Sequence, residues 1–126
     1  MKKLIGVYLL LFICCVSLYG TIYRGQCGEN AKWAFDFEGE VLTISGFGEM
    51  ANYASKDDAP WKGFSWKIGK VIIGDSITSI GTNSFDILSH CSSVILGKSL
   101  IRINEKAFNY CKYFSELIIP DNVRFI

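Results

Sequence analysis

Val71–Ile126 reads, in three successive segments, VIIGDSITSIGTNSFDILSHCSS, VILGKSLIRINEKAFNYCKYFSE and LIIPDNVRFI. When the segments are aligned at their common period of 23, apolar residues share columns: Val71–Val94–Leu117, Ile73–Leu96–Ile119, Ile77–Leu100–Val123, Ile80–Ile103–Ile126 and Phe85–Phe108. A fixed period of this length is typical of stacked repeats, in which no unit buries its apolar face alone. β-Branched residues dominate, and long stretches of helical period are absent. The sequence therefore predicts a mainly β solenoid of short parallel strands, with at most a helical turn around 107–111.

Alternate side chains of a strand face opposite ways, so Val71 and Ile73 are expected to point inward while Lys70 and Ile72 point outward. Stacking would then place the outward residues in two rows, Ile72–Ile95–Ile118 and Lys70–Ser93–Glu116. Exposed apolar stripes often mark interaction sites. These six residues are therefore the predicted ligand-binding face. The alternative is that the chain itself covers the stripe, or that it reflects β propensity alone.

The segment 21–66 precedes the repeats and contains a predicted β-hairpin. Its arms are 31–37, with Trp33 and Phe35 at period two, and 41–44, with glycine in the turn between them. The first unit of a solenoid needs a cap over its core. We expect Trp33, Phe35, Trp61 and Trp66 to form that N-terminal β cap; the alternative is an aromatic platform for carbohydrate.

The first twenty residues resemble a targeting segment. Lys2 and Lys3 precede an uncharged run, residues 4–19, that is shorter than the roughly 20 residues of a membrane span. This pattern predicts a signal peptide cleaved after Gly20, and an uncleaved anchor is the alternative. The expected organisation is thus a signal peptide over 1–20, a cap module over 21–66, and about two and a half repeats over 67–126.

Charge and cysteine content exclude several classes of partner and cofactor. Without residues 1–20 the chain carries 11 basic and 12 acidic residues, so no nucleic-acid partner is expected, and membrane contact only through an uncleaved leader. Cys27, Cys91 and Cys111 are an odd number; a Cys91–Cys111 bridge is conceivable, but buried free thiols are favoured. With one histidine and no Cys-x-x-Cys pair, no metal or other cofactor is expected.

Catalytic residues are not expected. His90 and Cys91 are neighbours in sequence, so their side chains point different ways and make a poor base–nucleophile pair. Ser92 and Ser93 lack the glycine pattern of a nucleophile elbow. The sequence therefore predicts that the protein is not an enzyme.

Several blocks resemble the BspA-like leucine-rich-repeat surface proteins. The repeat blocks that do so are 77–81 (ITSIG), 107–111 (AFNYC) and 119–123 (IPDNV), and those that resemble the family's opening module are 27–30 (CGEN) with Trp33, 42–46 (LTISG) and 59–61 (APW). Gly74 and Gly97 stand where the family usually has proline.

The resemblance implies a secreted or cell-surface leucine-rich-repeat protein that acts as a non-catalytic binding or adhesion module. Its expected partner is an extracellular or host-surface protein. The third repeat ends at Ile126, partway through the unit, so self-association through this uncapped repeat is a further expectation. The alternative is a structural cap fragment of a larger surface protein with no ligand of its own.

Overall fold

The computed structural model describes residues 20–114 and 117–126, and these residues are mainly β. The predicted signal peptide lies outside them except for Gly20. The elements in chain order are β1 (Ile22–Gln26), β2 (Ala31–Asp36), β3 (Val41–Gly46), β4 (Gly48–Glu49), the 3-10 helix η1 (Lys62–Phe64), β5 (Lys70–Ile73), β6 (Ile77–Ile80), β7 (Ser93–Ile95) and β8 (Arg102–Ile103).

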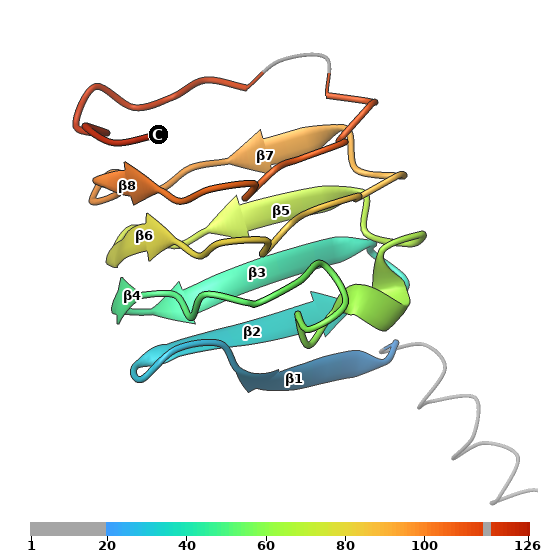
Figure 1. The fold of residues 1–126 in the computed structure, drawn as a ribbon. Coiled ribbons are helices and arrows are strands. Elements are labelled where there is room, and N and C mark those ends of the chain that lie inside the picture. The colour runs from blue at the N-terminus through green and yellow to red at the C-terminus, as the bar shows by residue number, and fades with distance from the viewer. Residues whose placement is uncertain (1–19, 115–116) are drawn as a thin grey trace, which may run out of the picture.

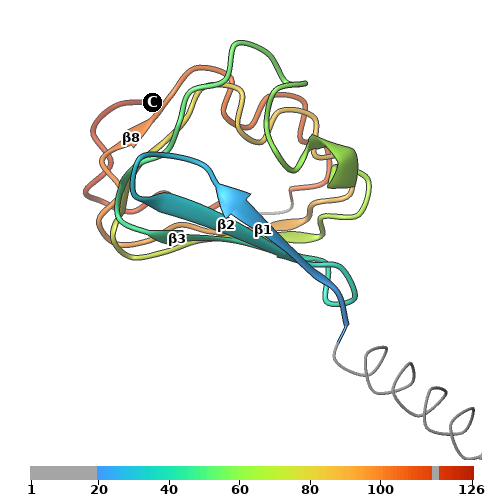
Figure 2. The same ribbon diagram turned by 90° about the horizontal axis from the view of Figure 1, so that it is seen from below.

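The strands form two sheets that lie side by side (Figure 1). The larger sheet has five strands in the order β1-β2-β3-β5-β7, and the smaller has three in the order β4-β6-β8. Seen along the stack, the first two repeats pass from the larger sheet to the smaller one and return through a loop (Figure 2). The larger sheet is mixed: β1–β2 and β2–β3 are antiparallel, whereas β3–β5 and β5–β7 are parallel.

The predicted repeat register is confirmed in both sheets. Val71 pairs with Val94 in the larger sheet, and Ile80 pairs with Ile103 in the smaller one. The alternation along β5 is also as expected, because Val71 and Ile73 are buried while Lys70 and Ile72 are half-buried on the opposite face. With this register, each inward side chain packs against the equivalent side chain of the preceding unit.

The predicted hairpin is confirmed as β2 and β3, joined by a turn in which Glu40 has a positive φ of 61°. Two features extend beyond the prediction. Strand β1 adds a further antiparallel strand outside β2, and β3 pairs in parallel with β5, with Leu42 opposite Val71. The second arm of the hairpin is therefore also the first strand of the parallel series.

An aromatic column runs through the core and joins the cap to the repeats. The rings of Trp61 and Phe85 stack at a centroid distance of 5.3 Å, and Phe85 stacks on Phe108 at the same distance. Trp61 also donates its indole N–H to the carbonyl oxygen of Ser84 at 2.8 Å. The expectation that the cap tryptophans are structural thus agrees with the burial of Trp33 and Trp61, whereas Trp66 is 61% exposed and is not part of the core.

The sequence allowed a helical turn around 107–111. In the structure, residues 105–110 form hydrogen-bonded turns, and the short helix of the described chain is η1. No helix among residues 20–114 and 117–126 is long and apolar enough to cross a membrane. Gly97 follows β7 where the chain passes close to the preceding unit: a Cβ at Gly97 would overlap the carbonyl oxygen of Gly74. A side chain at position 97 would therefore require the backbone of one of the two units to shift.

Candidate binding face

The outward face of the larger sheet carries the predicted binding residues. Ile72 lies opposite Ile95, and Lys70 lies opposite Ser93, so two of the three expected positions in each row are neighbours. The outward row that contains Ile72 continues into the cap with Thr43, a polar residue that lies opposite Ile72. Exposure rises along this row, because Ile72 is half-buried whereas Ile95 is 48% exposed.

The third position of each row departs from the expectation. Residues 117–120 are not a strand, so Ile118 does not extend the sheet, although it is 72% exposed. Ile118 and Pro120 instead form one wall of an open groove of about 650 Å³, whose other wall is residues 92–96. Glu116 lies outside the described residues. The candidate face is therefore a two-strand patch bordered by a groove.

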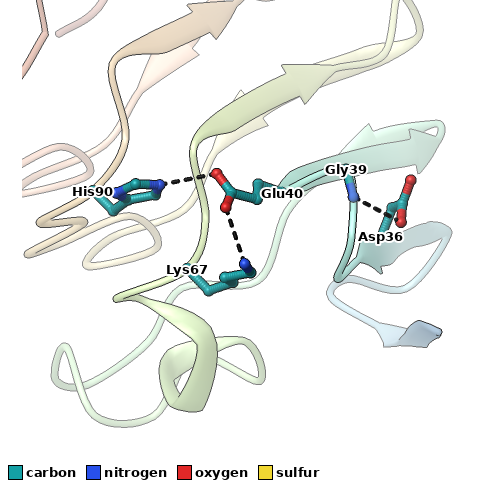
Figure 3. A network of polar contacts seen from close by, with 5 residues as sticks. All are labelled: Asp36, Gly39, Glu40, Lys67 and His90. Atoms are coloured by element: carbon teal, nitrogen blue, oxygen red, sulfur yellow. Dashed lines mark hydrogen bonds and ion pairs between the residues drawn. The ribbon is translucent and has the colours of Figure 1, made fainter. Parts of the chain in front are cut away.

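A polar network joins the starting ends of the three parallel strands of this sheet (Figure 3). Glu40 precedes β3, and its carboxylate lies 3.0 Å from Lys67 Nζ, in the loop before β5. The same carboxylate lies 2.9 Å from Nε2 of His90, in the loop before β7. The hydrogen bond with His90, followed by the one with Lys67, holds the pKa of the Glu40 carboxyl below its ordinary value.

This network lies at the surface, with Glu40 and Lys67 half-buried and His90 exposed, and ion pairs in such places contribute little free energy. Its role is geometric: it fixes the loops that lead into β5 and β7 relative to the turn that leads into β3. In the same turn, the Gly39 amide donates to the Asp36 carboxylate at 3.1 Å (Figure 3). The strand starts beside Lys70 and Ser93 are thus held by side chains from three segments of the chain.

The thiols of the described chain are free and poorly suited to nucleophilic chemistry. Burial raises the pKa of Cys27 to about 12 and that of Cys91 to about 11, and it also raises the pKa of Cys111. Such thiols remain protonated at neutral pH, and the thiolate is the reactive form. His90 and Cys91 do not act on each other, because His90 contacts Glu40 while the Cys91 thiol faces the carbonyl of Ser93 at 3.4 Å.

Among residues 20–114 and 117–126, no three side chains of histidine, cysteine, aspartate or glutamate lie close enough together to hold a metal ion.

Sequence reasoning missed two contributors to this region, Thr43 and the polar network of Glu40. Thr43 extends the outward row, but the spacing from Leu42 to its partner Val71 is longer than the repeat period, so a search at that period does not align β3 with β5. The two partners of Glu40 lie far from it in sequence. The one signal in the sequence is that Lys67 and His90 are one repeat apart, which places them at equivalent positions of neighbouring units.

Comparison with known proteins gives results that agree with this geometry. The sequence model of the BspA type leucine-rich repeat region, which spans six copies of the repeat, matches residues 63–126. No curated protein matches the chain. Among solved structures, the chain is similar to a leucine-rich repeat protein from Eubacterium ventriosum, with a TM-score of 0.77 and 25% sequence identity.

The alignment covers 84% of this chain and 28% of the Eubacterium ventriosum protein, so the chain spans little more than a quarter of that relative. The family match covers half of the present chain and falls on the residues whose repeat register the two sheets display. The resemblance drawn from the sequence is thereby confirmed, and the chain belongs to the BspA-type leucine-rich-repeat family.

Proposed function

We propose that this chain is a secreted or cell-surface repeat protein whose units stack as a solenoid, and that it binds an extracellular or host-surface protein in adhesion. Membership in the leucine-rich-repeat family supports a protein-binding module, since such proteins are generally non-catalytic. Proteins of the BspA type are typically surface or secreted bacterial proteins, which supports the compartment.

The observation that carries the proposal is the partly exposed apolar patch on the outward face of the larger sheet. Ile72 and Ile95 lie side by side in register, and Ile95 and Ile118 line the same groove. Lys70 and Ser93 form a polar margin beside the patch. An apolar centre with a polar rim is the usual anatomy of a protein-binding surface.

The non-catalytic part of the proposal is supported by the chemistry of the thiols. Cys27 and Cys91 are buried and protonated at neutral pH, and His90 is engaged by Glu40. A cysteine-based hydrolase would need an accessible thiolate with a histidine base within hydrogen-bond reach of it, which differs from the arrangement of these groups here.

The test compares two isoleucines of similar exposure on different sheets. Ile95 is 48% exposed in the candidate patch, and Ile101 is 43% exposed just before β8 of the smaller sheet. Labelled wild-type chain, Ile95→Asp and Ile101→Asp are titrated onto cultured animal cells, before and after trypsin removes surface proteins. We expect trypsin-sensitive binding that Ile95→Asp weakens about tenfold or more, whereas Ile101→Asp changes it little.

Circular dichroism serves as the folding control for both variants. Unchanged binding by folded Ile95→Asp would remove the patch from the proposal and favour a structural cap without a ligand. Unfolding of Ile95→Asp would show that the side chain belongs to the core, which would also refute the assignment.

A further inference from the structure

The outward face of the larger sheet continues past the apolar patch into the cap. One cross-strand row holds, in register, Ile95, Ile72, Thr43, Ala34 and Arg24. The row therefore crosses all five strands from β7 to β1, whose order can be followed in Figure 1. Its character changes along the sheet, because Ile95 and Ile72 are apolar whereas Arg24 is cationic and exposed.

A cationic depression lies at the cap end of this row. It is an open cavity of about 340 Å³ over strands β1 to β3, and Ala34 lies among its lining residues. The outward side chains around Ala34 are those of Arg24, Gln26, Lys32 and Ser45. Arg24 lies opposite Ala34 and Gln26 lies opposite Lys32, so the two cations are diagonal neighbours on one face. All four polar side chains can donate hydrogen bonds, which suits an oxyanion.

The two cations have no carboxylate of their own. In the part of the chain that the structure describes, no ion pair includes Arg24 or Lys32, and the residues that line the depression include no acid. Asp36 is the diagonal neighbour on the other side of Arg24, but it accepts a hydrogen bond from Gly39 and does not line the depression. Residues 1–19 contain no aspartate or glutamate. Like charges so close together repel each other, and an anion bound between them relieves that repulsion.

We propose that the depression between Arg24 and Lys32 is an anion subsite of the binding face and takes a carboxylate of the partner protein. This inference rests on the proposed function, in which a protein binds across Ile72 and Ile95. Neighbouring strands lie about 4.8 Å apart, so three strand spacings separate Arg24 from Ile72 by about 14 Å. The partner therefore presents an acidic side chain at about this distance from the apolar side chains that contact the patch.

The surroundings of the depression favour a protein carboxylate over a sulfated sugar. Sugar rings pack on exposed aromatic faces, whereas Trp33, the aromatic residue of the lining, is only 8% exposed. Sulfated polysaccharides are attracted by a broad positive field, and residues 21–126 carry 11 basic and 12 acidic residues. Two cations beside an apolar patch instead match a small number of acidic side chains on a protein surface.

A blocked glutamate hexapeptide tests the subsite without the unidentified partner. It is titrated at low ionic strength into the isotope-labelled full chain, and amide chemical shifts in nuclear magnetic resonance spectra follow its binding. We expect the shifts to cluster at residues 24–26, 32–34 and 45 and to diminish as salt is added. Arg24→Gln combined with Lys32→Gln should raise the dissociation constant about fivefold or more, because two charge contacts are lost.

The matched control removes the same charge elsewhere. Lys56 and Lys106 are exposed and lie outside the larger sheet, so Lys56→Gln combined with Lys106→Gln should leave the dissociation constant of the peptide nearly unchanged. The amide spectrum of each variant shows directly whether it is folded. Absence of shifts at the depression, or shifts that the Arg24 and Lys32 substitutions do not weaken, would overturn the proposal.

Binding to animal cells then links the subsite to the binding face. In the trypsin-sensitive assay, the Arg24→Gln and Lys32→Gln double variant should bind about fivefold or more weakly than wild type and depend less on salt. Unchanged cell binding by the double variant would overturn the inference while the proposed function stands. If wild type itself does not bind cells, the proposed function fails, and the peptide titration decides whether the depression holds a carboxylate.

Enzymatic digestion of the cell-surface glycosaminoglycans, which leaves the proteins in place, distinguishes the source of the anion. We expect this digestion to leave the difference between wild type and the double variant intact. If digestion abolishes that difference, the anion is a sugar sulfate, and the assignment to a protein carboxylate is wrong.

Discussion

Replacement of Phe85 by alanine is expected to be among the most destabilising single changes in the repeats. Phe85 is fully buried, and its ring lies between those of Trp61 and Phe108, with both centroid distances at 5.3 Å. Truncation of a buried phenylalanine costs about 3–5 kcal/mol through lost burial and the cavity left behind. The two stacked pairs add roughly 0.5–1.5 kcal/mol each beyond burial, so we expect the upper part of that range.

Urea denaturation measures this loss directly. Domains of this size are stable by about 5–15 kcal/mol, and a loss of about 4–5 kcal/mol should lower the urea midpoint by roughly 2 M or more. Tryptophan fluorescence comes from Trp33, Trp61 and Trp66, of which Trp61 touches the substituted ring, and it should report the same transition as circular dichroism if the unit and the cap unfold together. Phe85→Leu, which keeps most of the apolar volume, should cost about 1.5 kcal/mol or less beyond the lost stacking.

The matched control is Phe47→Ala, because Phe47 is exposed and its truncation should change stability by about 0.5 kcal/mol or less. A loss below about 2 kcal/mol for Phe85→Ala would refute the reasoning, since the site could not then be a closed, continuous column. Separate unfolding transitions by fluorescence and circular dichroism would refute the view that Trp61 couples the cap to the repeats.

Two further predictions concern the exposed turns and the polar network. Lys106 is exposed with a positive φ of 55°, which costs a non-glycine residue about 1 kcal/mol, so Lys106→Asn should raise the melting temperature; a lower value would contradict this. The pKa of Glu40 is lowered in the folded chain, so its contribution to stability is present above the unfolded pKa and is lost as pH falls through the folded pKa. The free energy of unfolding of wild type should therefore exceed that of Glu40→Gln at pH 7, with the difference shrinking toward pH 3; a difference independent of pH would show that the charge of Glu40 is immaterial.

Much of the repeat architecture could be predicted because it follows from a strict period. The columns that contain Val71 and Phe85 recur at the same spacing, and equal spacing forces equivalent residues into neighbouring positions of a stack. The hairpin of β2 and β3 was also accessible, since alternating aromatics and a glycine turn are local signals. Rows of outward residues then follow from the two-residue alternation of a strand.

The irregular parts of the chain escaped prediction because no local rule determines them. The role of β3 depends on an insertion that changes the spacing between Leu42 and Val71, and β1 gains its place from pairing with β2 rather than from its own pattern. The candidate site was predicted in part for the same reason: Ile72 and Ile95 obey the register, whereas Ile118 lies in a segment that leaves the sheet.

The sequence by itself determined the mainly β class, the repeat register and the family, because each depends on spacing along the chain. The tertiary structure alone decided which side chains remain uncovered. Trp66 is exposed while Trp33 and Trp61 are buried, although all three belong to the same segment of the sequence. Ile126 is exposed while Ile80 is buried, although both occupy one column. Burial depends on which neighbour packs against a residue, and that neighbour is specified by the whole fold rather than by the residue's own position in the repeat.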